Sequence, residues 1–301
     1  MPSFAVSISI LSLAQGVLVA LPAGRPAEWA KRFRSPWWAL VPALSIVVVI
    51  GIVALEGESA EVLSWLALIA VPPLAALSLA TLIHGARPVW ALAAPPLFVL
   101  AWASPGSLAG EASAAALTGL GCIGLGWLLV SVAPVTWLKA GIYAMAAVDT
   151  WFVAAELLQG PNSVLSAAVP AGLPRLQVVH FGAAQMGFGD FFVAATLGCL
   201  LALPADGPET HLIGGFPARR QNLQIIGAAL VAILALAFDL LFFAVDTLPA
   251  TVPVAVALAA LELHGRRRPA CRWLSHPMGG QPPARPTSDA GDAGDDEYER
   301  E

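Results

Sequence analysis

Apolar segments long enough to cross a lipid bilayer follow one another along almost the whole chain. A helix needs about 20 mostly apolar residues to cross the hydrocarbon core. About nine segments approach that length, at 4–22, 37–55, 62–83, 88–104, 112–133, 136–158, 178–203, 223–245 and 247–264. Charged residues make up only 12% of the 301 residues, whereas a soluble domain carries roughly 25%. We therefore predict an all-α integral membrane protein with about nine transmembrane helices, placed in the cell membrane.

Basic residues are distributed unevenly between the segments that connect these helices. The loop at 23–36, the pair at 219–220 and the chain after residue 264 carry arginines or lysines, whereas the loop at 55–61 carries glutamates and no base. Arg175 departs from the alternation. Because cytoplasmic loops hold an excess of Lys and Arg, we predict an extracytoplasmic N-terminus and a cytoplasmic C-terminus.

The chain divides into two parts by composition. Residues 1–264 form the predicted polytopic transmembrane domain. Residues 265–301 are first basic and then acidic, and they are rich in Pro, Gly and Ala. A segment with so little apolar content cannot bury a core, so we predict a disordered cytoplasmic tail. Its basic run is expected to contact anionic headgroups, which makes the bilayer a partner; no nucleic-acid partner is expected.

Three acids lie inside apolar segments, namely Asp149, Asp190 and Asp239. Each costs about 2.5–3.5 kcal/mol on insertion scales. Asp149 and Asp190 lie near the centres of two consecutive, antiparallel predicted helices, so they can meet at one depth. Two carboxylates in contact share a proton, so one can act as a base on water while the other polarises a carbonyl. Asp239, nearer a helix end, is a rival for either role.

Glycines surround the second of these acids. Gly187 and Gly189 permit close approach of another backbone and weaken the local helix, which suits a site that admits an extended peptide. The sequence holds no H-E-x-x-H and no G-x-S-x-G pattern. Zinc and serine mechanisms therefore have no support, and we expect neither a metal nor a cofactor.

Gly187-Phe188-Gly189-Asp190 matches the Gly-x-Gly-Asp signature of presenilins and signal peptide peptidases. That family has nine spans, with catalytic aspartates in the sixth and seventh and a Pro-Ala-Leu motif at the start of the ninth. Here Pro249-Ala250-Thr251 stands at that place, and Val148 stands where the family usually has Tyr. The chain thus resembles a prokaryotic homologue of these GxGD intramembrane aspartyl proteases.

The resemblance implies an aspartic endopeptidase that cleaves transmembrane peptides or proteins. It implies Asp149 and Asp190 as catalytic residues. It further implies a set of substrate-binding residues: Gly187, Phe188, Gly189, Pro249, Ala250 and Thr251. We also predict that the loop 160–176 receives substrate together with the Pro249 region, with 164–169 offering a short strand.

Other functions remain open from the sequence. Prepilin peptidases share the Gly-x-Gly-Asp element, but their second aspartate is usually followed two residues later by Lys, where this chain has Phe192. A proton- or cation-coupled transporter would also place acids in the membrane. Such a transporter should show paired halves, and the sequence shows none. A non-catalytic member of the protease family is the third alternative.

Overall fold

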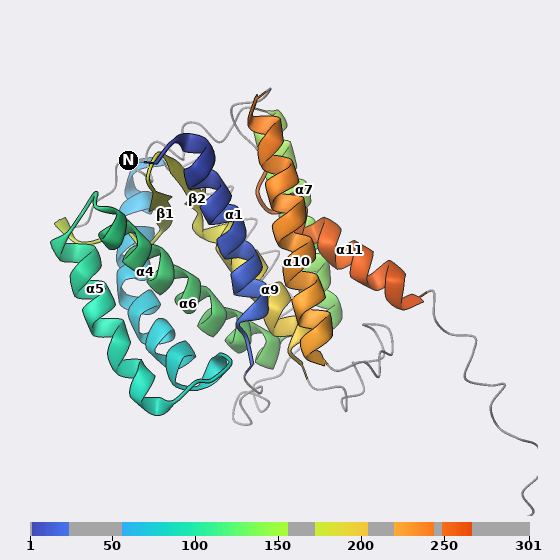
Figure 1. Cartoon of the computed structure of the whole chain (residues 1–301), viewed down its shortest axis with the longest axis horizontal. Coiled ribbons are helices and arrows are strands. Elements are labelled where there is room, and N and C mark those ends of the chain that lie inside the picture. The colour runs from blue at the N-terminus through green and yellow to red at the C-terminus, as the bar shows by residue number, and fades with distance from the viewer. Residues whose placement is uncertain (1, 24–55, 156–171, 204–219, 244–248, 267–301) are drawn as a thin grey trace, which may run out of the picture. The chain divides into compact units, whose positions relative to one another are not determined.

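The computed structural model describes residues 2–23, 56–155, 172–203, 220–243 and 249–266, and this part of the chain is mostly helical (Figure 1). Its elements are α1 (Phe4–Ala20), α4 (Glu56–Leu77), the π-helix η2 (Ser78–Leu82), the 3-10 helix η3 (Pro88–Ala93), α5 (Ala94–Ala103), α6 (Leu108–Val132), α7 (Val135–Ala154), β1 (Val178–Phe181), β2 (Ala184–Gly187), α9 (Phe188–Leu201), α10 (Arg220–Asp239), the 3-10 helix η6 (Leu240–Phe243) and α11 (Val252–Arg266). The predicted segment 37–55, the loop 160–176 up to residue 171, and the tail from residue 267 lie outside the described residues.

Two of the described helical stretches, Ser64–Leu82 with 19 residues and Leu108–Val132 with 25 residues, are long and apolar enough to cross a membrane. The other apolar helices are shorter: Phe4–Ala20, Pro88–Ala103, Phe188–Leu201, Leu223–Asp239 and Val252–His264. The prediction that the chain forms mostly apolar helices is therefore confirmed for the described residues. The number of about nine transmembrane helices is not confirmed, since length and composition point to membrane association for two helices only.

The proline pair Pro72-Pro73 does not end the helix in which it lies. Pro72 and Pro73 lie inside α4, which continues to Leu77 instead of being interrupted. The backbone hydrogen-bond pattern changes only after Leu77, where the π-helical turn η2 follows. In this turn the Ser78 hydroxyl donates a 2.7 Å hydrogen bond to the Leu120 carbonyl of α6. Close packing of α4 on α6 supports the helix across the prolines: a Cβ at Gly124 would lie 2.9 Å from the Leu74 carbonyl oxygen. The proline-containing part of α4 is thus closely packed against α6.

The predicted helix at 178–203 is wrong in its first part. Residues Val178–Phe181 and Ala184–Gly187 pair as an antiparallel hairpin, with Val178 opposite Gly187, and the helix begins only at Phe188. The all-α prediction therefore needs this correction. The consequence for the site is direct, because Asp190 stands in the first turn of a helix and not at the middle of one.

The hairpin has local and tertiary causes. Val178 and Val179 are β-branched and favour an extended backbone. The turn contains Gly182 at φ 60°, a conformation that other residues rarely adopt. Its N–H donates to Glu111 of α6 at 2.7 Å, and the next N–H donates to the Ser7 hydroxyl of α1 at 3.2 Å. Two helices therefore fix the turn that leads into α9.

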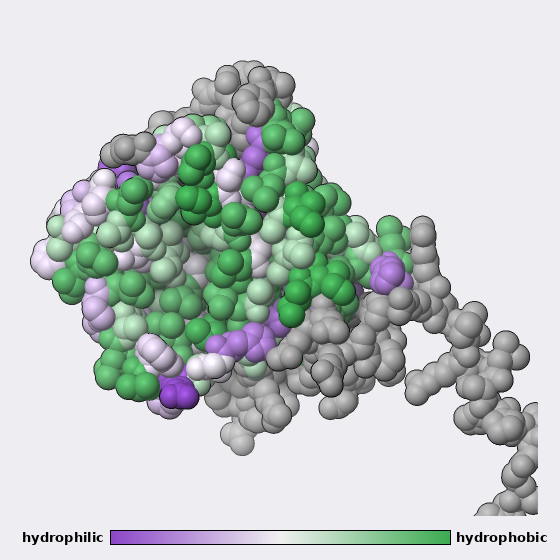
Figure 2. Space-filling model, in the orientation of Figure 1, coloured by the Kyte–Doolittle hydropathy of each residue, from purple (hydrophilic) through white to green (hydrophobic). Residues whose placement is uncertain are grey.

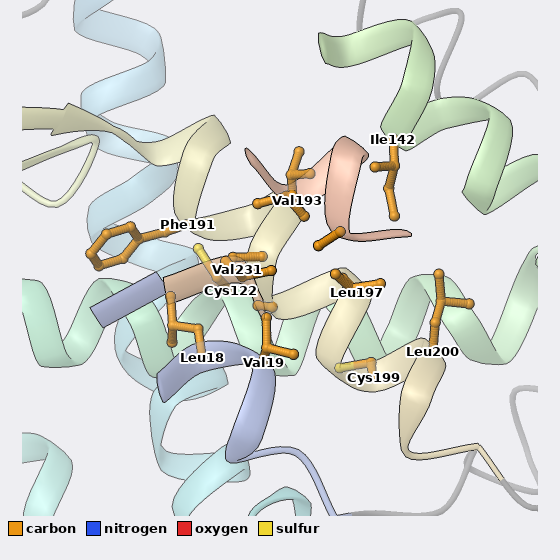
Figure 3. Packing of buried hydrophobic residues seen from close by; sticks show 14 of the residues in the cluster. Leu18, Val19, Cys122, Ile142, Phe191, Val193, Leu197, Cys199, Leu200 and Val231 are labelled. Atoms are coloured by element: carbon orange, nitrogen blue, oxygen red, sulfur yellow. The ribbon is translucent and has the colours of Figure 1, made fainter. Parts of the chain in front are cut away.

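The helix α9 is buried almost along its whole length, and Figure 3 shows it surrounded by apolar side chains from several helices. The residues that meet there include Phe191, Val193, Leu197 and Leu200 of α9, Leu18 and Val19 of α1, Cys122 of α6, Ile142 of α7, and Val231 of α10. Dense packing on all sides leaves the helix little freedom to shift. The acid in its first turn is therefore carried by a firmly held element.

The outward helix faces are apolar as well (Figure 2). On α1 the side chains of Val6, Ile10, Leu13 and Val17 share one face at helical spacing, with 50%, 40%, 46% and 53% of their surface exposed. The helix α10 exposes isoleucines in the same way, at positions 225, 226 and 233. These helices thus present large apolar side chains on the outside as well as toward the core.

Candidate active site

Asp149 lies on the last turns of α7 and is held by the segment before α11. The Thr251 hydroxyl donates a 2.7 Å hydrogen bond to Asp149 Oδ2. Thr251 is buried, with 2% of its surface exposed, and it follows the buried Pro249. The Pro249-Ala250-Thr251 segment therefore contacts the first predicted catalytic acid directly. Thr251 supplies that contact.

Asp190 is held by the turn that starts α9. Its Oδ2 accepts a 3.0 Å hydrogen bond from the backbone N–H of Gly187, which is the N-cap of the helix. Acids are favoured in a first helical turn because they satisfy free N–H groups and oppose the positive end of the helix dipole. Gly187 also leaves room for this bond, since a Cβ there would lie 3.2 Å from the same carboxyl oxygen. The Gly-x-Gly-Asp pattern thus has a local structural cause.

The two carboxyl groups are near enough for the charge of Asp149 to influence Asp190. Both side chains are partly buried. They come from α7 and α9, which make little direct contact. The structure therefore brings together two carboxyl groups from separate helices, each with its own hydrogen-bond donor.

The remaining predicted site residues lie around this pair. Phe188 begins α9 and its ring stacks on Phe192, with centroids 6.5 Å apart. Gly189 is open on its outer side, because a Cβ there would meet only Met145 Cε of α7, at 3.8 Å. Ala250 contributes its carbonyl oxygen as a hydrogen-bond acceptor for Gln15 of α1, at 3.3 Å. Small residues thus leave space beside Asp190, on the side that faces α7.

Asp239, the rival acid, occupies a different place. It ends α10, and its carboxyl group interacts with Ser12 of α1. Its other oxygen, Oδ2, is buried and has no hydrogen-bond partner within the described part of the chain. Asp239 thus interacts with α1, whereas Asp149 and Asp190 are held by Thr251 and Gly187.

An ion pair that the sequence did not reveal joins α7 to α11. Lys139 Nζ lies 2.7 Å from Glu262 Oε1, and the Tyr143 hydroxyl donates to Glu262 Oε2 at 3.3 Å. This lysine lies about three turns before Asp149 on the same helix, so its charge is engaged away from the acid pair. The helix α7 is thus attached to α11 at two levels, through Glu262 and through Thr251.

Sequence reasoning also missed Gln15, a buried amide in the first apolar segment with 1% of its surface exposed. The sequence did contain a sign of its importance, because a polar side chain that is buried among apolar ones usually has a specific partner.

Among the described residues, no group of three or more His, Cys, Asp or Glu side chains is placed to hold a metal ion. No protein-family model, curated protein or solved structure matches this chain.

Proposed function

We propose that this protein is an intramembrane aspartyl protease that hydrolyses peptide bonds in transmembrane segments through Asp149 and Asp190. The observation that carries the proposal is that Gln15 joins the two segments that hold these acids, the Pro249-Ala250-Thr251 segment and the strand that ends at Gly187. The two acids belong to different helices, and each is oriented by one hydrogen bond, from Thr251 or from Gly187. The Gly-x-Gly-Asp and Pro-Ala-Thr segments therefore meet at one site, as the resemblance to presenilins and signal peptide peptidases implies.

The chemistry follows from a shared proton. Two adjacent carboxylates repel each other, so the pair is expected to hold one proton at neutral pH. The ionised carboxyl group removes a proton from a water molecule while the water oxygen attacks the scissile carbonyl carbon. The protonated group donates to the carbonyl oxygen and so stabilises the charge that develops on it. A proton then passes to the leaving nitrogen, the C–N bond breaks, and an acid and an amine are released.

Access for an extended substrate is supported by the hairpin. A peptide must leave the helical state before its scissile carbonyl can be attacked, and its backbone groups must still be hydrogen-bonded in an apolar environment. The two-stranded sheet ends at Gly187, and α9 with Asp190 follows immediately. We propose that the substrate strand adds beside β2, between this hairpin and the Pro249 segment. The predicted strand at 164–169 lies outside the described residues.

We further propose a multi-pass arrangement in the cell membrane, with about nine spans, an extracytoplasmic N-terminus and a cytoplasmic C-terminus. The outward apolar faces of α1 and α10 support it, because exposed apolar area is costly in water at about 25 cal/mol per Å² and costs nothing in lipid. The alternation of basic and acidic loops supports the orientation.

Reporter fusions test this topology. A fusion at Glu58, in the base-free segment, should report the extracytoplasmic side, and a fusion at Arg268 should report the cytoplasm. An alkaline phosphatase and a fluorescent protein reporter give opposite readouts on the two sides. A Glu58 fusion that reports cytoplasm would show that the proposed orientation is wrong.

Replacing Thr251 by Val tests the contact between the Pro249 segment and Asp149. Val has nearly the same shape, so the packing of this buried position is kept while the hydrogen bond to the carboxyl oxygen is lost. Such a bond contributes about 1.5–3 kcal/mol to placing a charged acceptor. We expect kcat for cleavage of a transmembrane peptide to fall about 10-fold or more, with little change in thermal unfolding.

Thr196→Val is the matched control for this variant. Thr196 is equally buried, on α9, and within the described part of the chain its hydroxyl has no hydrogen-bond partner. Its replacement should leave kcat unchanged and stability equal or higher, because a buried unsatisfied hydroxyl is removed. Equal activities of the Thr251→Val and Thr196→Val proteins would count against a role of Thr251 in the site.

A further inference from the structure

Gln15 of α1 contacts both of the segments that hold the acids. Its Nε2 donates to the Ala250 carbonyl oxygen at 3.3 Å and to the Met186 sulfur at 3.4 Å. Both amide hydrogens are thereby used. The two acceptors come from distant parts of the chain, the segment before α11 and the strand β2. One side chain of α1 therefore joins these two segments.

Each acceptor lies one residue from a group that orients a carboxyl. Ala250 is followed by Thr251, whose hydroxyl binds Asp149. Met186 is followed by Gly187, whose N–H binds Asp190. Two short chains of contacts thus run from the amide of Gln15 to the two acids.

We propose that Gln15 is a positioning residue that sets the distance between the Asp149 and Asp190 carboxyl groups. This inference rests on the proposed protease function. Direct contact between α7 and α9 is limited, so it constrains that distance only in part. The helix α11 contacts both α7 and α9, and α1, packed along α9 and α10, adds through Gln15 a link to both acid-bearing segments.

The burial and hydrogen bonding of Gln15 favour a role in positioning the acids over a role in stabilising the fold. With 1% exposure it is fully desolvated, and its Oε1 has no hydrogen-bond partner within the described residues. An unsatisfied buried oxygen costs about 1–3 kcal/mol. Of the two bonds that Nε2 makes, the one to the Ala250 oxygen is long, at 3.3 Å, and the other has sulfur, a weak acceptor. An apolar side chain of the same length would therefore be expected to stabilise this position better than glutamine does.

Gln15→Met tests the proposal in the purified full-length protein with a transmembrane peptide substrate. Methionine fills nearly the same volume and removes both the donor and the unsatisfied oxygen. We expect kcat to fall about 10- to 100-fold, since misplacement of reacting groups by about 1 Å has effects of that size. KM should change less than about 3-fold and thermal unfolding should occur at the same or a higher temperature, because no substrate contact is removed.

Gln224→Met is the matched control. Gln224 of α10 is also a buried glutamine, and its Nε2 donates to the Val19 and Pro22 carbonyl oxygens at 3.0 and 2.7 Å. Val19 lies one turn after Gln15 on α1 and Pro22 follows the helix, but neither acceptor belongs to the two segments that donate to the carboxyl groups. Its replacement should lower the unfolding temperature and leave kcat per folded molecule unchanged. The two glutamines are thus expected to show opposite patterns of activity and stability.

An Asp149→Asn variant in the same experiment distinguishes failure of the proposed protease function from failure of the positioning role of Gln15. If Asp149→Asn still cleaves the peptide, the proposed function is wrong. If Asp149→Asn is inactive while Gln15→Met has the kcat of the wild type, only the positioning role is overturned. A Gln15→Met protein that fails to fold would also contradict it, since a stabilising role is then indicated; Gln15→Asn, which withdraws the amide by one methylene, should independently reproduce the loss of kcat.

Discussion

Replacing either Asp149 or Asp190 by asparagine should abolish hydrolysis of a transmembrane peptide by the purified protein. The reaction needs one ionised and one protonated carboxyl group, and an amide can take neither role. Asparagine still accepts a hydrogen bond through its oxygen, so the contacts with Thr251 and Gly187 can persist. Both variants should therefore fold and enter the membrane, the more so because a charge is removed from an apolar region.

The double variant and the pH dependence sharpen this prediction. Asp149→Asn combined with Asp190→Asn should be no worse than either single change, because the two groups act as one unit. The activity of the wild type should fall at low pH, where both carboxyl groups are protonated, and at high pH, where the shared proton is lost. The measurement is the appearance of new peptide termini within the substrate's apolar segment, followed by mass spectrometry across a pH series.

Asp239→Asn is the matched control for these variants. It makes the same chemical change in α10, at a carboxyl group whose recorded interaction is with Ser12. We expect cleavage to be retained. Retained cleavage in Asp149→Asn or in Asp190→Asn would instead rule out the acid pair, whereas no cleavage by the wild type would favour a proton- or cation-coupled transporter as the explanation for acids in apolar helices.

The sequence predicted helices where hydropathy and local signals agree. The segment predicted at 112–133 is α6, Leu108–Val132, and it begins where the Ser107 hydroxyl caps the N–H of Gly110 at 3.0 Å. The first part of the segment at 178–203 was predicted wrongly because hydropathy does not distinguish an apolar strand from an apolar helix. Two adjacent β-branched residues followed by Gly182 were the available signal for a hairpin.

The candidate site was predictable in its residue types and not in its contacts. Acids inside apolar segments are costly enough to stand out in a sequence, which is how Asp149 and Asp190 were found. The bond between Thr251 and Asp149 joins residues 102 positions apart, and no local pattern encodes it. The pairing of Lys139 with Glu262 is likewise set by how α7 lies against α11. Such contacts depend on tertiary packing and need the folded structure.

The glycine Gly198 should be far less tolerant of substitution than Gly189, although both lie on α9. A Cβ at position 198 would lie 2.7 Å from the Val19 carbonyl oxygen and 2.8 Å from that of Leu18. These are backbone atoms of α1 and cannot rotate away, so α1 and α9 would have to separate. We expect Gly198→Ala to lose about 1–3 kcal/mol of stability, even though alanine favours a helix over glycine by about 1 kcal/mol.

Gly189→Ala provides the comparison within the same helix. Among the described residues beyond its own helical turn, the new methyl group would meet Met145 Cε at 3.8 Å, an ordinary van der Waals distance. Thermal unfolding in detergent should therefore occur at the wild-type temperature or above it, whereas Gly198→Ala should unfold several degrees lower. Cleavage should nevertheless decrease in Gly189→Ala, because the methyl group fills space next to Asp190 that we assign to the substrate. A Gly198→Ala protein as stable as the wild type would show that α1 and α9 are not packed as closely as described, and the support that α1 gives to both acid-bearing segments would then lose its basis.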